Sequence, residues 1–200
     1  MGLAMYKQLM LLGLLLERPM YGQQIREVIE NHHDLLADLI KKPTIYYQLE
    51  RLAHDGYLEI RRETVEAPGP GAAHEDVALR ERDVYYITEA GRRYFHSLLR
   101  RTLSNYTPGL NNADVDACLF FLHHLAPSEA LELLTERYAR MTAARQASVA
   151  QMQTLSHPDD AHLFVQDHKL TLLDAEISWL ERTIAYLRTS PQVASTSVPS

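Results

Sequence analysis

The sequence predicts a mainly α-helical protein, and three observations carry that prediction. A short helix with clear start and stop signals lies at residues 43–57, two strand-like stretches follow it, and the rest of the chain shows helical patterns only. We expect residues 1–104 to form one domain and residues 105–188 an all-α second domain. The last segment, 189–200, is small, polar and contains proline, and it is expected to be a disordered tail.

The helix PTIYYQLERLAHDGY is defined by its ends and by one apolar stripe. Pro43 suits the first helical position, and Gly56 suits the left-handed conformation that follows a helix end. Ile45, Leu49 and Leu52 recur at helical spacing, so they should face the core. The side chains that then point outward are Thr44, Tyr47, Arg51 and His54, with Tyr46 and Gln48 on the flanks.

This outward face carries hydroxyls, an amide and an arginine, which are groups that reach phosphates and base edges. A helix of this kind suits the major groove of DNA. The alternative for the face taken by itself is a plain solvated surface.

The neighbours of this helix complete a known domain pattern. Residues 5–16 are almost wholly apolar, as in a buried helix, but they fall short of the about 20 residues that span a membrane. After Arg18-Pro19, the segment YGQQIREVIEN predicts a second amphipathic helix. Residues 57–63 and 84–87 predict two strands, and Thr88 can cap a helix that starts near Glu89. Helix, helix, helix, strand, loop, strand, helix is the order of a winged helix-turn-helix.

At this point the chain resembles the PadR-type transcriptional regulators. The motifs LMLLGLLLERPMYGQQI, PTIYYQLERLAHDGYLE and YYITEAGRRYF carry the resemblance, at the spacing that the family uses. It covers roughly residues 5–100, and beyond them it rests on a long helical tail like that of the larger, Vir-like members. The chain departs from the family at Tyr47, where a small residue or proline is usual. It departs again in a longer stretch between the wing strands, about residues 64–82.

The resemblance implies a homodimeric DNA-binding repressor, released by a small hydrophobic or aromatic effector. It matches residues at four places in the family pattern: Tyr21 and Gly22 where the second helix opens, Thr44, Tyr46 and Leu49 in the recognition helix, Tyr57 and Leu58 at the exit into the wing, and Tyr86 and Gly91 at the junction of strand and helix. The expected partner is double-stranded DNA with an inverted-repeat operator. We expect these DNA-binding side chains: Tyr21, Lys41, Lys42, Thr44, Tyr46, Tyr47, Gln48, Arg51, Arg61, Arg62, Arg80 and Arg82.

The net charge of −6 speaks against a DNA-binding protein, because such domains are usually basic. Residues 1–104 carry 14 Lys and Arg against 15 Asp and Glu, whereas residues 105–200 carry 6 against 11. The acidic excess therefore lies in the second half, and local cations beside the recognition helix and at the wing can still meet phosphates. The alternative function is a winged helix that serves as a protein-interaction module, which the acidic balance favours slightly.

The second half predicts helices at about 113–125, 127–155 and 159–188. Seven apolar side chains of the last helix recur in a heptad pattern, which is the seam of a coiled coil. We expect this seam to join two copies of the chain, because a winged helix needs a partner to read two half-sites. A helical hairpin within one chain is the alternative. The predicted dimer residues are Leu163, Leu170, Leu173, Ile177, Leu180, Ile184 and Leu187.

Aromatic residues of the second half offer a candidate effector site at Phe120, Phe121 and Trp179, although core packing explains them equally well. No cofactor and no metal site is expected, because adjacent histidines on an α-helix point about 100° apart. No catalytic residues are expected either: Cys118 lies in an apolar run, which disfavours a thiolate. A single cysteine fits a reducing compartment, and the start of the chain lacks the pattern of a secretion signal. The protein is therefore expected to be a cytoplasmic non-enzyme.

Overall fold

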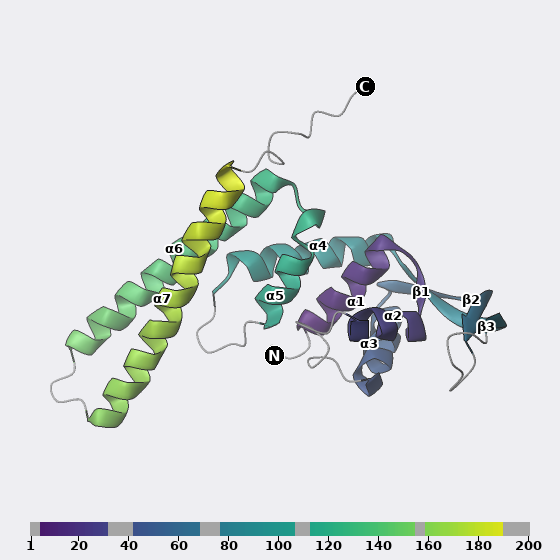
Figure 1. Ribbon diagram of the computed structural model, residues 1–200, viewed down its shortest axis with the longest axis horizontal. Helices are drawn as coiled ribbons and strands as arrows, with labels where there is room; N and C mark the ends of the chain where they lie inside the picture. Colours follow the sequence, from purple (N-terminus) through teal and green to yellow (C-terminus); the bar gives the residue numbers. More distant parts are fainter. Residues whose placement is uncertain (1–4, 32–41, 69–76, 107–112, 155–158, 190–200) are drawn as a thin grey trace, which may run out of the picture. The chain divides into compact units, whose positions relative to one another are not determined.

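The computed structural model describes residues 5–31, 42–68, 77–106, 113–154 and 159–189 (Figure 1). The elements are α1 (Met5–Glu17), β1 (Met20–Tyr21), α2 (Gly22–Asn31), α3 (Lys42–His54), β2 (Leu58–Pro68), β3 (Val77–Ile87), α4 (Glu89–Ser104), α5 (Ala113–Phe120), η2 (Leu122–His124), α6 (Pro127–Gln153) and α7 (Asp160–Thr189). They form two compact units, of residues 1–99 with 111–121 and of residues 100–110 with 122–200. Unit 1 contains the predicted winged helix-turn-helix, and it also takes in α5. In the described part of the chain, no helix combines the length and the apolar character needed to span a membrane.

Unit 1 is built around α1, whose side chains are buried along most of the helix. Gly13 allows a close approach here, since a Cβ on this residue would lie only 2.6 Å from the ring of Phe121. Phe121 is fully buried and meets Phe95 edge to face, with ring centroids 5.8 Å apart. Phe121 is therefore a core residue, and its prediction as an effector contact is wrong.

The N-terminal end of α1 is capped by a residue that is distant in the sequence. The backbone N–H of Tyr6 donates a hydrogen bond to Oδ1 of Asp114, the second residue of α5, over 3.0 Å. Burial raises the pKa of the Asp114 carboxyl, and the hydrogen bond from Tyr6 acts in the opposite direction. This contact joins α5 to α1 of the winged helix.

The C-terminal end of α3 has the cap that the sequence predicts. Gly56 has φ +79°, and the N–H of Tyr57 reaches back to the carbonyl of Leu52 over 2.9 Å. The Thr88 hydroxyl donates to the Gly56 carbonyl and also accepts the N–H of Gly91 over 3.0 Å, which starts α4. Both the left-handed end of α3 and the Thr88 cap are confirmed.

The sheet has the order β1-β3-β2, with antiparallel pairs only. The wing strands are longer than the sequence predicts, because their pairing runs from Leu58↔Ile87 to Pro68↔Val77. Residues 69–76, within the stretch where we expected a long loop, lie outside the described residues. The two-residue strand β1 was missed, since two residues are too few to show any alternation.

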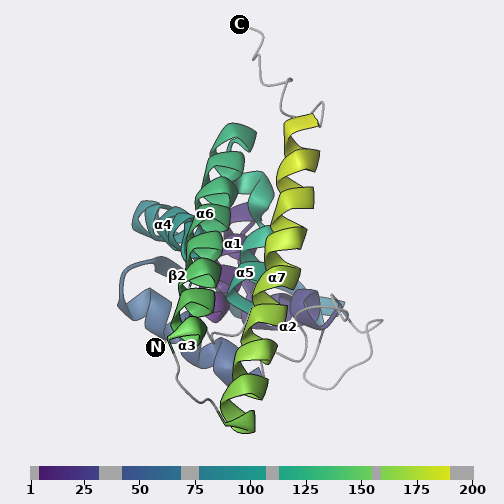
Figure 2. The same cartoon turned by 90° about the vertical axis from the view of Figure 1, so that its left-hand side faces the viewer.

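Unit 2 is a helical hairpin in which α6 and α7 run side by side (Figure 2). Leu173, Leu180 and Ile184 of α7 are buried, as are Leu134 and Met141 of α6. An ion pair joins the same two helices, because the buried guanidinium of Arg137 contacts the Glu176 carboxylate.

The predicted dimer seam is therefore wrong at its centre: Leu173, Leu180 and Ile184 already pack within one chain. The helix that packs on them is α6, which the sequence did not identify as the partner because its apolar heptad positions are less regular. Leu170, Ile177 and Leu187 are half-buried, and Leu163 is exposed. The hairpin that stood as the alternative is what the structure shows. Except for Thr189, the last residue of α7, the predicted tail lies outside the described residues.

Candidate nucleic-acid interface

The two faces of α3 separate as the sequence predicts. Ile45, Leu49 and Leu52 are fully buried and attach the helix to unit 1. Tyr47 is 59% exposed, Arg51 and His54 are exposed, and Thr44 is half-buried. The helix therefore presents an aromatic ring, a hydroxyl, a guanidinium and an imidazole to the outside.

Gln48 does not belong to this outward face, and its prediction as a DNA contact is wrong. Its side chain is only 5% exposed. Gln48 lies about 40° from Leu52 around the axis, so it faces inward with the apolar stripe. Its Oε1 atom has no hydrogen-bond partner among the described residues.

Tyr21 is likewise buried rather than open to DNA. It forms β1, pairs with Val84 of β3, and packs with Val65 and Tyr86 at the base of the wing. Burial raises the pKa of its phenol, Glu27 raises it further, and Arg82 opposes both. Its prediction as a DNA contact is corrected, because the missed strand β1 turns this ring into the sheet.

Tyr46 lies against the start of α2. Its ring covers Gly22 so closely that a Cβ there would be 2.5 Å from the ring, which explains the need for glycine. Tyr46 remains 37% exposed. A cleft of about 450 Å³ opens beside it, with these lining residues: Tyr21, Gly22, Gln23, Tyr46, Glu50, Arg82, Asp83 and Tyr85.

Glu50 is the outward residue of α3 that we did not predict. It lies four residues from both Tyr46 and His54, about 40° from each around the axis, and its side chain is exposed. No ion pair or hydrogen bond joins it to another described residue. Its charge reaches Tyr85, whose pKa is raised by burial first and then by Asp83, Glu50 and Tyr46. The helical step that identified Tyr47 would also have found Glu50.

The structure describes the side chain of Arg51 on α3, but not those of the two lysines at the start of the helix. The Arg51 guanidinium lies 3.9 Å from Asp55, at the long limit of an ion pair, so it is free to reorient. Lys42 begins α3, but its side chain lies outside the described residues, as does all of Lys41.

Two of the wing arginines, Arg61 and Arg62, are already engaged by carboxylates. Arg61 donates two hydrogen bonds to Glu59, over 2.8 and 3.1 Å, and lies over the ring of Tyr86. The hydrogen bond from Arg61 lowers the pKa of the Glu59 carboxyl. Arg62 contacts Asp83 over 2.9 Å.

Over the whole wing, acidic and basic side chains nearly balance. Arg62 also lies 3.6 Å from Glu81, and Arg82 donates to the Glu81 carbonyl. The two strands carry four arginines, including Arg80, but five acidic residues. The basic wing that the sequence predicts is therefore close to neutral.

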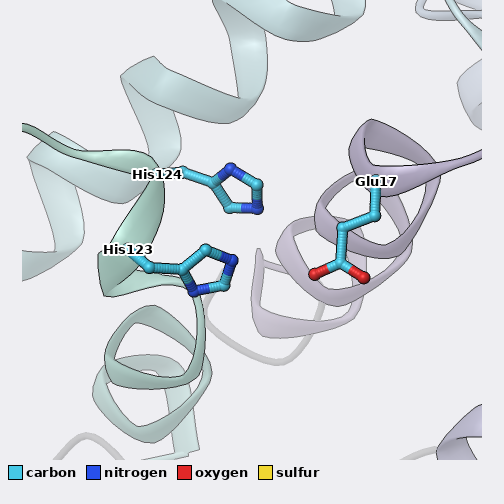
Figure 3. A group of neighbouring side chains, drawn as sticks. All are labelled: Glu17, His123 and His124. Carbon is cyan, nitrogen blue, oxygen red and sulfur yellow. The ribbon is translucent and has the colours of Figure 1, made fainter. Parts of the chain in front are cut away.

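A pair of histidines lies outside this interface. His123 and His124 lie on η2 with ring centroids 4.2 Å apart, so the expectation that they point apart is wrong on this 3₁₀ turn (Figure 3). Glu17, the third side chain drawn there, ends α1 in the other unit. Two imidazoles alone are fewer ligands than the three or four of a protein zinc site.

The predicted effector residues do not form one pocket within a unit. Phe120 and Phe121 belong to unit 1, while Trp179 is half-buried on α7 of unit 2. Within unit 2, a groove of about 270 Å³ lies between α6 and α7. Its lining residues are Thr135, Tyr138, Glu181, Ile184, Ala185 and Arg188.

Comparison with known proteins gives one family and a group of similar structures. Residues 11–97 match the family described as "Transcriptional regulator PadR-like family". No curated protein matches the chain. Bacillus subtilis PadR in complex with operator DNA is 22% identical, with 90% of this chain and 98% of that chain covered and a TM-score of 0.40. The same protein in complex with p-coumaric acid is 20% identical (95% and 99% covered, TM-score 0.38). The PadR-like regulator BC1756 from Bacillus cereus is 17% identical (91% and 98% covered, TM-score 0.37).

Proposed function

We propose that this chain is a cytoplasmic, sequence-specific repressor of the PadR-like family of transcriptional regulators, whose family model residues 11–97 match. It acts as a homodimer on an inverted-repeat operator, with one α3 helix in each of two successive major grooves. The observation that carries the proposal is the outward face of α3, where Tyr47 and Arg51 are exposed on a helix whose opposite face is fully buried through Ile45, Leu49 and Leu52.

In this proposal the contacts fall into two groups. Thr44, Tyr46, Tyr47 and Arg51 of α3 lie in the major groove, where hydroxyl and guanidinium groups meet base edges and phosphates. The second group meets phosphates only, and it consists of Lys41, Lys42, Arg61, Arg62, Arg80 and Arg82. Arg61 and Arg62 first have to exchange their carboxylate partners for phosphates. Exposed ion pairs contribute little stability, so this exchange is possible.

The proposed effector is a small aromatic molecule, and the groove between α6 and α7 is its candidate site. Ile184 and Ala185 offer apolar surface there, while Arg188 offers a cation for a polar substituent. Such a ligand releases DNA only if it binds the released state more tightly than the DNA-bound state. A thermal-shift screen of small aromatic acids, repeated with Arg188→Ala, tests the site. A shift that persists unchanged in the variant would place the ligand elsewhere.

The DNA-binding proposal is tested by selecting duplexes from a random pool with the full-length protein. We expect an inverted repeat whose half-sites lie about 34 Å apart, one turn of DNA. Tyr47→Ala should weaken binding to the selected duplex about tenfold or more, the loss of one good base contact. Its melting temperature should stay unchanged, because Tyr47 is exposed. A pool in which no sequence is enriched would contradict the proposal and favour the protein-interaction module.

A further inference from the structure

Unit 1 contains a cleft whose chemistry the proposed DNA contacts do not explain. The cleft has a volume of about 450 Å³, which lies within the range of small-molecule sites. Its lining comes from β1, α2, α3 and β3, so segments that are distant in the sequence meet there. All four elements belong to unit 1, and the cleft is therefore a feature of one compact unit.

The walls of the cleft are rich in aromatic side chains. Tyr21 and Tyr85 are almost fully buried, whereas Tyr46 is 37% exposed, so the ring of Tyr46 is the most open to a ligand. Gly22 allows this ring to lie at the edge of the cleft, because a Cβ at residue 22 would be 2.5 Å from it. The face of a tyrosine ring attracts cations, since its π electrons make that face negative.

The charged side chains of the lining are mostly acidic. They are the carboxylates of Glu50 and Asp83 and one guanidinium, that of Arg82. Asp83 already accepts a hydrogen bond from Arg62 over 2.9 Å, and Arg82 donates one to the carbonyl of Glu81. Glu50 is exposed and forms no ion pair or hydrogen bond with another described residue. Glu50 is therefore the charge of the cleft that is available to a ligand.

The carboxylates and the phenols of the cleft lie close enough to act on one another. Burial raises the pKa of the Tyr85 phenol, and the charges of Asp83 and Glu50 raise it further. Tyr46 acts on the same pKa in the same direction. Negative charge and aromatic surface thus coincide, and both would stabilise a positive charge in the cleft.

The spacing of Tyr46 and Glu50 indicates the size of the cation. Glu50 follows Tyr46 by four residues, so the two side chains are neighbours on the surface of α3, with Cβ atoms about 5–6 Å apart. A ligand that reaches both needs an aromatic ring and a charged group separated by a short linker.

We propose that this cleft binds a small organic cation, of the class of aromatic primary amines. The ammonium group donates hydrogen bonds to the Glu50 carboxylate, and the aromatic ring packs on Tyr46. The buried rings of Tyr21 and Tyr85 form the inner wall. This ligand is opposite in charge to the aromatic acids proposed for the groove of unit 2, and the two sites share no residue.

A bound amine also competes with DNA, and this part of the inference rests on the proposed function. Tyr46 and Glu50 belong to α3, so an amine that covers the ring and neutralises the carboxylate removes both from the major groove. By thermodynamic linkage, DNA must lower the affinity for the amine by the same factor.

Binding to the cleft is tested by isothermal titration calorimetry on the full-length protein without DNA. The probe is phenethylamine. Phenethyl alcohol has the same ring without the charge, and methylamine has the charge without the ring. We expect phenethylamine to bind about tenfold or more tightly than either control, because each control lacks one of the two contacts. Equal binding of phenethylamine and phenethyl alcohol, or no binding of phenethylamine, would overturn the proposal.

Three variants locate the site. Glu50→Gln removes the charge but keeps the size of the side chain, and it should weaken phenethylamine binding about tenfold or more. Glu89→Gln removes an equal charge at the first residue of α4, outside the cleft, and should bind like the wild type. Arg188→Ala, in the groove of unit 2, should also bind like the wild type.

Circular dichroism checks that the two glutamine variants are folded, as expected for substitutions at exposed positions. Unchanged binding by Glu50→Gln would overturn the assignment of the amine to this cleft. Loss of binding in Arg188→Ala would overturn it as well, because the amine would then lie in the groove of unit 2.

Competition is tested separately, on a duplex selected by the full-length protein. Phenethylamine at a saturating concentration should weaken binding of this duplex about fivefold or more. Methylamine at the same concentration adds the same ionic strength and should have a much smaller effect. An unchanged DNA affinity with phenethylamine bound would overturn the competition. If no duplex is enriched, the proposed function fails, while the calorimetry still decides whether the cleft binds the amine.

Discussion

The recognition helix and the wing both present charged side chains, but they hold them in different ways. On α3, Glu50 has no described partner and Arg51 has only a distant one in Asp55. On the wing, Arg61 is bound by Glu59, and Arg62 by Asp83. Under the proposed function, these groups of α3 could therefore bind DNA without losing a close protein partner, while Arg61 and Arg62 of the wing would first lose one.

The comparison implies a division of roles. A side chain without a protein partner loses no protein contact when it forms a hydrogen bond to DNA. The side chains of α3 should therefore determine the base preference. A wing that is close to neutral should add modest affinity that depends on salt but not on sequence. Two Glu→Gln variants, one on α3 and one on the wing, test this difference in roles.

The larger effect is expected from Glu50→Gln. A glutamate in the major groove accepts from the cytosine amino group, whereas glutamine pairs with adenine. The variant should shift the preferred base at one position in each half-site, and the preference should change by about 1–3 kcal/mol. Selection from a random pool measures this. Glu89→Gln removes an equal charge at the exposed first residue of α4 and should leave the selected sequence unchanged. An unchanged selection by Glu50→Gln would mean that Glu50 lies outside the groove.

A smaller effect is expected from Glu59→Gln, which frees Arg61 from its ion pair. The variant should bind all DNA somewhat more tightly, and the slope of log affinity against log salt should steepen by up to about one unit, for one added phosphate contact. The base preference should stay the same. Titration of one selected and one unrelated duplex at several salt concentrations tests this. Tighter binding to the selected duplex alone would show that the wing reads sequence.

Periodicity and end signals predicted most of unit 1. The stripe of Ile45, Leu49 and Leu52, the left-handed Gly56 and the Thr88 cap are local features, and all are confirmed. Contacts between distant segments were not predictable in this way. The cap of α1 by Asp114 joins residues 108 positions apart, and no local pattern announces it.

The errors in the candidate site have similar causes. Tyr21 was placed on the surface because β1, only two residues long, gives no strand signal, and its pairing with β3 buries the ring. The pairing of Arg62 with Asp83 depends on the register of β2 and β3. A count of charges along the two strands shows that the wing is close to neutral, but it could not show which carboxylate each arginine contacts.

The helical hairpin shows why one heptad pattern was assigned to the wrong partner. Leu173 and Leu180 give a clear apolar repeat, but a repeat does not say which helix covers it. The irregular α6 covers it through Leu134, Met141 and the ion pair of Arg137.

The central claim, that α3 reads the bases while the wing supports binding, is tested most directly by comparing Arg51→Ala with Arg61→Ala. Both variants remove one exposed guanidinium from unit 1. Each is titrated against the selected operator and against the operator with single base changes. We predict that Arg51→Ala loses about 1–3 kcal/mol of specific affinity and relaxes the preference at one position, whereas Arg61→Ala weakens all duplexes alike. A relaxed preference in Arg61→Ala, with an unchanged one in Arg51→Ala, would contradict the account.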